Sequence, residues 1–163
     1  MPRLSDIEDQ TSAEHPDDRL LVVVGGNLVV NRRGDLFRNQ RTTTTATTGT
    51  LQEGESATIR FSVPPSIEIL AVEASAPARV RLYSNADALT ADAARPRTTR
   101  PTPGIGLILE TVHEAASTVV LDPHAHGSNM EHPIVESLPA RIQNIGPATA
   151  ITLTLTYIQR ERS

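Results

Sequence analysis

The sequence predicts an all-β protein: an antiparallel, jelly-roll-like β-sandwich preceded by an extended N-terminal arm and a short hairpin. Three observations favour this fold class. The 163 residues include 19 threonines and 12 prolines, and β-branched residues interrupted by Pro and Gly are typical of many short strands joined by turns. Only four residues are aromatic and none is tryptophan, so we expect an aliphatic core. Several segments alternate apolar and polar residues, as strands with one buried face do.

The first 50 residues are predicted to form a region distinct from the sandwich. Residues 1 to about 19 are polar and acidic without periodicity, and we interpret them as an arm that folds against a partner. Two apolar runs then flank Gly25-Gly26-Asn27, a suitable hairpin turn. The threonine-rich tract at 42–48 is expected to be a linker or an extended strand on a partner's edge. Composition therefore divides the chain into an N-terminal region, 1–50, and a sandwich domain, 51–163.

Seven strands are predicted in the sandwich domain, with a short eighth strand near 134–138 as an alternative. Each is bounded by Pro, Gly, Asn or Asp. They cover residues 57–63, 67–73, 78–84, 106–112, 117–122, 140–144 and 148–158. Only residues 86–94 have helix-like composition, enough for two turns before Pro96. The pattern predicts a β-sandwich of either jelly-roll or immunoglobulin-like topology.

The strand at 148–158 shows the alternation most clearly. Leu153 and Leu155 fall on one face, whereas Thr152 and Thr154 fall on the other. Such a period of two is typical of an antiparallel strand with one face in the core.

Charge and composition exclude several function classes. All 15 basic residues are arginine, and 19 acidic residues bring the net charge to −4, so nucleic acid is a poor candidate partner. The absence of cysteine excludes disulfides, thiolate metal sites and a cysteine nucleophile. The longest apolar run, Leu20 to Val24, is far shorter than the roughly 20 residues of a membrane helix, and the acidic N-terminus does not resemble a signal peptide. We expect a soluble protein of one domain.

The segment LDPHAHGSNMEHP contains the residues best suited to hold a metal ion. Two histidines at i and i+2 on a strand point to the same face and can share a cation with a third ligand. His124, His126 and His132 are therefore candidate metal ligands. Because prolines and a glycine interrupt the segment, we expect a loop with unspecified geometry. The alternative is a set of solvated loop histidines that line a subunit contact, and we expect no cofactor.

Two further groups are candidates for contact with a partner. Arg95, Arg97 and Arg100 are separated by prolines, and guanidinium groups on a stiff backbone suit the carboxylates of an acidic segment. The alternative is a solvated connecting loop. In the predicted hairpin, Leu21 and Val23 are apolar side chains that a partner could cover.

The sequence lacks the common catalytic motifs. It contains no Gly-x-Ser-x-Gly, no His-Glu-x-x-His and no phosphate-binding glycine loop, so we do not expect an enzyme. Carbohydrate binding is the usual alternative for a β-sandwich. Because sugars stack on exposed aromatic rings, the four aromatic residues make this function less favoured.

Three segments of the sandwich domain share a pattern with one group of known proteins. They read PSIEILAVEASAPARVRLYSNADALTADAARP, PTPGIGLILETV and IQNIGPATAITLTLTYI. The recurring elements are Ala-Pro-x-x-Val-Arg-Leu-Tyr at 76–83, an Ala- and Asp-rich turn at 90–95, Pro-Thr-Pro-Gly at 101–104, and the closing strand at 144–157. This pattern, which covers residues 64–158, resembles small β-rich structural proteins of tailed bacteriophages and prophages.

The resemblance implies a non-catalytic virion component with a jelly-roll-like fold. We expect a symmetric oligomer, most favourably a trimer, in which the arm contacts neighbouring subunits. Its other partners would be major capsid or tail proteins, and its place the virion, assembled in the host cytoplasm. Both a tail or baseplate position and a capsid cement or decoration role stay open. The alternative function is a host-surface carbohydrate-binding module on a sandwich scaffold.

Overall fold

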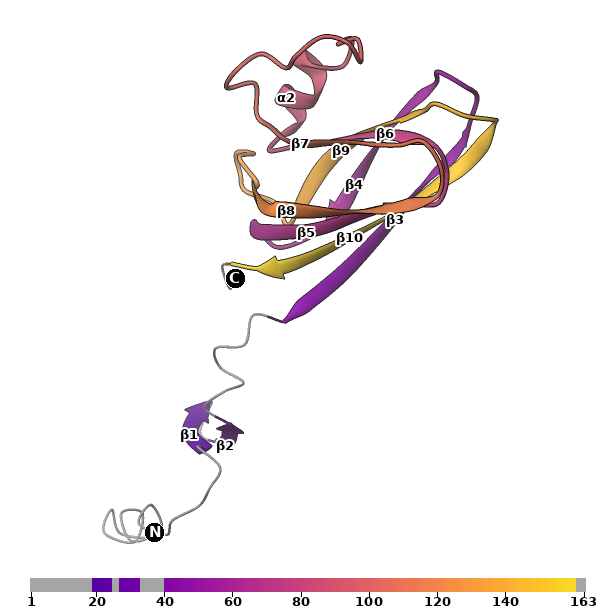
Figure 1. Ribbon diagram of the computed structural model, residues 1–163. Helices are drawn as coiled ribbons and strands as arrows, with labels where there is room; N and C mark the ends of the chain where they lie inside the picture. Colours follow the sequence, from indigo (N-terminus) through magenta and orange to yellow (C-terminus); the bar gives the residue numbers. More distant parts are fainter. Residues whose placement is uncertain (1–18, 25–26, 33–39, 161–163) are drawn as a thin grey trace, which may run out of the picture. The chain divides into compact units, whose positions relative to one another are not determined.

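The computed structural model describes residues 19–24, 27–32 and 40–160, and the arm predicted at 1 to about 19 lies almost entirely outside them. The chain divides into two units, Met1–Arg38 and Asn39–Ser163 (Figure 1). In the first unit, β1 (Arg19–Val24) pairs antiparallel with β2 (Asn27–Arg32), with Val24 opposite Asn27. This pairing confirms the predicted hairpin.

The second unit is a sandwich of two antiparallel sheets of four strands each, counted over the described residues (Figure 1). The first sheet has the order β3 (Arg41–Leu51), β10 (Thr149–Gln159), β5 (Ser66–Ala74), β8 (Ser117–Ser128). The second has the order β4 (Ser56–Ser62), β9 (Ser137–Asn144), β6 (Ala78–Tyr83), β7 (Leu107–His113). The expected antiparallel sandwich is therefore confirmed.

The order of pairing identifies the topology as a jelly roll. The first strand of the sandwich pairs with the last, and each following strand pairs with the one before the last partner. Thus β3 pairs with β10, β4 with β9, β5 with β8, and β6 with β7. These four nested pairs form one long antiparallel hairpin. Rolling that hairpin also brings β5 against β10 and β6 against β9, which closes two four-stranded sheets, as in jelly rolls.

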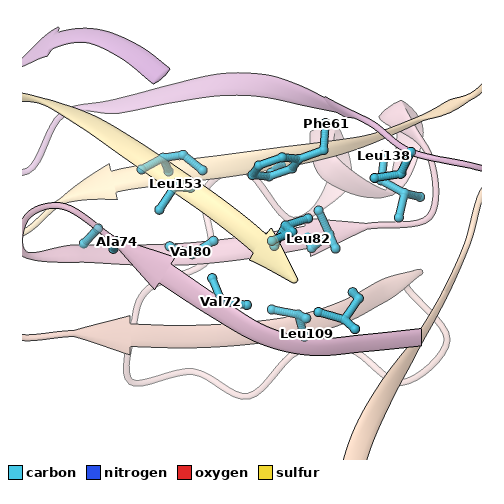
Figure 2. Packing of buried hydrophobic residues seen from close by; sticks show 14 of the residues in the cluster. Phe61, Val72, Ala74, Val80, Leu82, Leu109, Leu138 and Leu153 are labelled. Atoms are coloured by element: carbon cyan, nitrogen blue, oxygen red, sulfur yellow. The ribbon is translucent and has the colours of Figure 1, made fainter. Parts of the chain in front are cut away.

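The core lies between the two sheets and is almost entirely aliphatic (Figure 2). Leu153 on β10, Val72 on β5 and Leu82 on β6 are at most 1 % exposed. Fully burying such a side chain contributes roughly 1.5–3 kcal/mol. On β10 the buried residues alternate with partly exposed threonines, as the period of two predicts.

The threonine-rich tract differs from its prediction. It is β3, an edge strand of the first sheet, and not a linker or a strand on a partner. Thr47 lies opposite Thr152, and their hydroxyl groups are 2.9 Å apart. The hydroxyl of Thr48 accepts a hydrogen bond from the Ile151 amide (3.0 Å) where the ladder is irregular. Because β3 belongs to the sandwich, the predicted boundary near residue 50 is wrong, and the second unit begins at Asn39.

β8 and β9 differ in extent from the strands predicted from the sequence. β8 continues to Ser128, so His124 and His126 lie on an edge strand and not in a loop. An edge strand accommodates Pro123 because one side of its backbone needs no ladder partner. Residues 134–136 form no strand, and β9 begins at Ser137.

The one helix among the described residues of the sandwich unit, α2 (Ala86–Ala91), is three residues shorter than predicted. Asn85 is its N-cap and its side chain accepts a hydrogen bond from the Ala88 amide (2.7 Å). Asp92 follows as the C-cap, with its side chain turned into the protein. Among the described residues, no helix has the length and apolar character needed to cross a bilayer.

Candidate functional site

The segment from Ser84 to Gly106 covers the outer face of β6. Alternation along β6 directs Val80 and Leu82 into the core, so Arg79, Arg81 and Tyr83 fall on the opposite face. All six residues of β6 are nevertheless buried. α2 and the loop after it fold over this face, where Tyr83 packs with Ala88, Leu89 and Leu107.

The covering segment is closed at its base. The Ser84 amide donates a hydrogen bond to the Gly106 carbonyl (2.9 Å). Gly106 has a φ of 86°, which glycine adopts at little cost. A β-carbon there would lie 2.7 Å from the Ser84 hydroxyl oxygen. A larger residue at this position would require the Ser84 side chain and Ala88 of α2 to shift.

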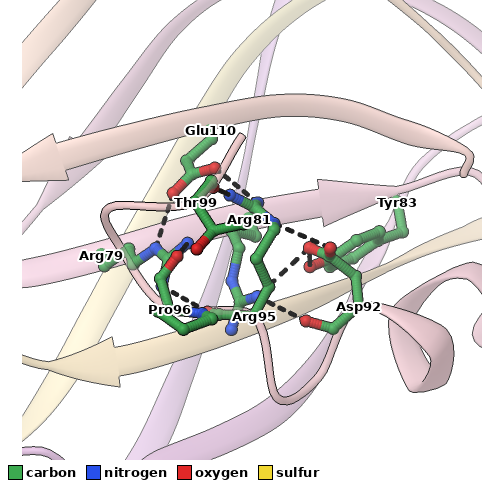
Figure 3. Close-up of polar contacts among 8 residues, drawn as sticks. All are labelled: Arg79, Arg81, Tyr83, Asp92, Arg95, Pro96, Thr99 and Glu110. Carbon is green, nitrogen blue, oxygen red and sulfur yellow. Dashed lines mark hydrogen bonds and ion pairs between the residues drawn. The ribbon is translucent and has the colours of Figure 1, made fainter. Parts of the chain in front are cut away.

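Asp92 is the centre of a buried group of charges, here called the polar cluster: Arg79, Arg81, Tyr83, Asp92, Arg95 and Glu110 (Figure 3). Its Oδ1 accepts from Arg95 Nε at 2.7 Å. Its Oδ2 accepts from the Tyr83 hydroxyl at 2.7 Å and from Arg81 Nη1 at 3.2 Å. Arg81 Nη1 also donates to the Asp92 main-chain carbonyl at 2.8 Å. A single carboxylate thus binds three side chains of the sheet and the covering segment.

Glu110 on β7 is the second carboxylate of the polar cluster. It accepts from Arg79 Nε and from Arg95 Nη2, both at 2.6 Å. Arg79 Nη1 further donates to the Arg95 carbonyl (3.0 Å), and Arg95 Nη1 to the Thr99 carbonyl (2.8 Å). These charge-assisted bonds fasten the loop after α2 to the sheet.

Burial and ion pairing act in opposite directions on these charges. Burial opposes ionisation of Asp92 and Glu110, but hydrogen bonds from Arg95 and further partners outweigh it and hold both pKa values below their usual range. Burial raises the pKa of Tyr83, and the hydrogen bond to Asp92 raises it further. Burial lowers the pKa of Arg81, and the adjacent charge of Arg79 also lowers it. Both carboxylates are therefore ionised at neutral pH.

A pocket of about 440 Å³ lies beside the polar cluster and is called the arginine pocket. Its lining includes Gly54, Ser56 and Gln143 and five arginines: Arg79, Arg81, Arg95, Arg97 and Arg141. The carboxylates that pair with these arginines are Asp92, Glu110 and Glu114. Of the described residues, no carboxylate lines the pocket itself. Five guanidinium groups against three carboxylates leave an excess of two positive charges, so the pocket suits an anion.

The arginines predicted to contact a partner have three different environments. Arg95 is only 8 % exposed and is bound within the polar cluster. Arg97 forms an exposed ion pair with Glu114 (2.8 Å) and lines the arginine pocket. Arg100 is exposed and outside the pocket lining. The prediction placed these three residues together as a surface group, whereas the structure brings only Arg95 and Arg97 to one site.

The predicted metal ligands are not brought together. His124 Nδ1 lies 2.8 Å from Glu68 Oε1, and Arg160 also pairs with Glu68. His126 is opposite Glu68 in the β5–β8 register, and His132 lies in the exposed loop before β9. Within residues 19–24, 27–32 and 40–160, no group of three or more His, Asp or Glu residues is arranged to hold a metal ion. The three-histidine site is therefore not formed within one chain over these residues.

The other predicted residues concern the hairpin and the aromatic side chains. Leu21 and Val23 lie on β1, opposite Val30 and Leu28 respectively. Among the described aromatic residues, Phe61 and Tyr83 are fully buried and Tyr157 is 6 % exposed. The described residues therefore offer no aromatic surface on which a sugar could stack.

A second pocket, of about 810 Å³, lies between α2 and residues 101–107. Its lining includes Leu107, Ile105 and the exposed Met130. It adjoins a smaller pocket of about 320 Å³ that His132 and Glu131 help to line.

Sequence reasoning missed the polar cluster. The alternation along residues 78–83 is visible in the sequence, but it does not show that residues 84–106 fold back over the face that carries Arg79 and Arg81. Asp92 falls within the predicted helix at 86–94, and Arg141 within the predicted strand at 140–144. The available signal was that two arginines alternate with core residues on a strand followed by an Asp- and Arg-containing loop.

The fold and the polar cluster define a jelly-roll β-sandwich with a covering helical segment and an anion-suited pocket. No family model matches the chain, and no curated protein matches it either.

Proposed function

We propose that the chain is a non-catalytic structural component of a tailed bacteriophage virion. It assembles as a symmetric oligomer, most favourably a trimer, and its N-terminal unit contacts neighbouring subunits. Its partners are further copies of itself and major capsid or tail proteins. Both a tail or baseplate position and a capsid cement or decoration role fit this proposal.

The observation that carries the proposal is the division of the chain into a jelly roll and a separate small hairpin unit. β1 and β2 have only six residues each, and an isolated two-stranded hairpin is at best marginally stable in water. Residues 20–24 are continuously apolar, which is typical of strands covered on both faces. The hairpin therefore needs a surface to pack on, and a neighbouring subunit supplies one.

The jelly roll suits assembly into a symmetric oligomer. Its nested pairing gives a compact module with an aliphatic core, and closed symmetry lets copies of one module form a ring through identical contacts. Apolar residues are also exposed on the sandwich: Val120, Met130 and Ile134 are more than 60 % exposed. Such residues become favourable contacts when subunits associate.

The decisive experiment is the mass of the full-length protein by light scattering after size exclusion. We expect one closed oligomer whose mass is a small multiple of 17.6 kDa, with three copies most favourable. The double substitution Leu21→Asp and Val23→Asp should release monomers, because charges cannot be covered by an apolar neighbour. The matched control is Asn31→Asp on β2. A monomer at all concentrations, or an oligomer unaffected by the double substitution, would contradict the proposed role of the hairpin.

Position within the virion is measured separately. Quantitative mass spectrometry of purified particles gives the copy number, which is hundreds for a cement protein and a few for a tail-tip protein. Absence of the protein from purified particles of a phage whose genome encodes it would overturn the proposal.

A further inference from the structure

Two arginines that line the arginine pocket each have an Nε donor without an acceptor among the described residues. Arg81 is 2 % exposed, and its Nε has no hydrogen-bond acceptor. Arg141 is half-buried, and its Nε is also buried without an acceptor. Burying a charged donor without a partner costs several kcal/mol in general. Both residues line the arginine pocket, so an anion in it would lie beside two guanidinium groups whose hydrogen bonding is incomplete.

The strand register is a second reason to expect an anion beside Arg81 and Arg141. Arg81 on β6 and Arg141 on β9 are direct partners in the antiparallel ladder. Like charges directly opposite each other on neighbouring strands repel. Asp92 neutralises Arg81 on the side of the covering segment, but no described carboxylate pairs with Arg141. An anion between the two guanidinium groups would convert the repulsion into two charge-assisted hydrogen bonds.

The chain itself carries a matching acidic segment. Residues 1–18 contain six carboxylates and a single arginine. The rest of the sandwich surface offers no equally concentrated group of arginines among the described pockets. Charge complementarity therefore favours the acidic segment as the occupant of the arginine pocket.

We propose that the arginine pocket binds a carboxylate from residues 1–18 of a neighbouring copy, with Arg81 and Arg141 as its donors. The source of the segment rests on the function proposed above, in which the N-terminal unit contacts neighbouring subunits. The site itself rests on the excess of guanidinium groups that line the pocket and on the facing pair Arg81 and Arg141. The two parts can therefore fail separately.

The test uses the absence of native cysteine, which makes introduced thiols the only ones. Full-length Ala13→Cys is mixed with full-length Gln143→Cys, whose new thiol lies in the arginine pocket, and treated with a short bis-maleimide cross-linker. The matched control replaces Gln143→Cys with Thr118→Cys, an exposed position on β8 in the other sheet. We expect cross-linked dimers with Gln143→Cys at about ten times the control yield, as expected for contacts made through charged hydrogen bonds.

A charge variant tests the donors. Arg141→Gln should lower the Gln143→Cys yield about tenfold, the loss of one charged hydrogen bond. Arg100→Gln, which removes the same charge from an exposed position outside the pocket, should leave it unchanged. Because Arg141→Gln relieves a repulsion, the variant should fold, and circular dichroism checks this. Equal effects of the two variants would overturn the assignment of Arg141.

The remaining outcomes separate the two proposals. The doubly substituted chain, Ala13→Cys with Gln143→Cys, can also cross-link within one chain. Cross-links found only within chains retain the pocket as the carboxylate site and overturn the contact between copies. Equal yields at Gln143→Cys and Thr118→Cys overturn the pocket, even if light scattering shows the expected oligomer.

Discussion

At the scale of single residues, Asp92 has the largest consequence for stability. It is 2 % exposed and pairs with Arg81 and Arg95. Such a pair, once buried, contributes little net stability, but removing one partner leaves the other charge uncompensated. Asp92 thus contributes to holding the covering segment on the sheet together with Glu110.

Asp92→Asn should therefore lower the free energy of unfolding by about 3–5 kcal/mol, the usual cost of breaking a buried ion pair. The amide cannot neutralise Arg81, and it places a donor where carboxylate oxygens now accept. Chemical denaturation measures this loss. Glu53→Gln, at an exposed turn position, is the control and should change the stability little; a similar small change for Asp92→Asn would contradict the proposed importance of the cluster.

His113 makes stability depend on pH. It is 1 % exposed, with Nε2 3.1 Å from the Thr111 hydroxyl and Nδ1 3.0 Å from the Ser117 hydroxyl. Burial lowers its pKa below the ordinary value of 6.5. The unfolded chain therefore takes up a proton before the folded chain does. This contribution to stability is present above about pH 6.5 and is lost as the pH falls toward the folded-state pKa.

We expect the melting temperature to fall between about pH 7 and pH 5. His113→Asn, which cannot be protonated in this range, should show a smaller fall than the native chain, though from a lower starting point. Calorimetry at several pH values measures both slopes. Identical slopes would mean that His113 does not contribute to the pH dependence.

At the scale of elements, β10 shows most clearly how the two faces of the first sheet differ in burial. It pairs with β3 on one side and β5 on the other, and Leu153 is fully buried while Thr156 is partly exposed. Substitutions on the two faces of this one strand should therefore differ sharply in effect.

Leu153→Asp should prevent folding, because an unpaired buried charge costs several kcal/mol and the leucine contacts are lost as well. Thr156→Asp makes the same change on the opposite face and should leave the fold intact. Far-ultraviolet circular dichroism and solubility distinguish them. A soluble, native-like Leu153→Asp protein would show that the face of β10 is misassigned.

At the scale of the whole molecule, the boundary between the two units, which the structure places before Asn39, can be tested by the melting temperatures of truncated chains. A chain starting at Asn39 contains all of β3, whereas a chain starting at Ala46 lacks the first five of its eleven residues. The shorter chain also exposes part of the β10 edge, and unpaired edges promote aggregation. We expect cooperative unfolding for 39–163 and a lower melting temperature with aggregation for 46–163. Equal melting temperatures would mean that this part of β3 adds no stability.

The alternation of residues by itself determined much of the fold. The sequence pattern correctly placed the seven strands from residue 57 onward, apart from the extents of β8 and β9, and it correctly predicted the hairpin and the aliphatic core. The period of a strand and the preferences of turns are local properties.

Only the tertiary structure decided which strands pair and what covers each outer face. The threonine tract has no apolar face of its own, so its place beside β10, more than 100 residues later in the chain, could not be read locally. The polar cluster forms because a loop returns over β6, and Arg81 meets Arg141 because β9 pairs with β6. These contacts depend on the nested pairing of distant strands, which local patterns of hydrophobicity do not encode.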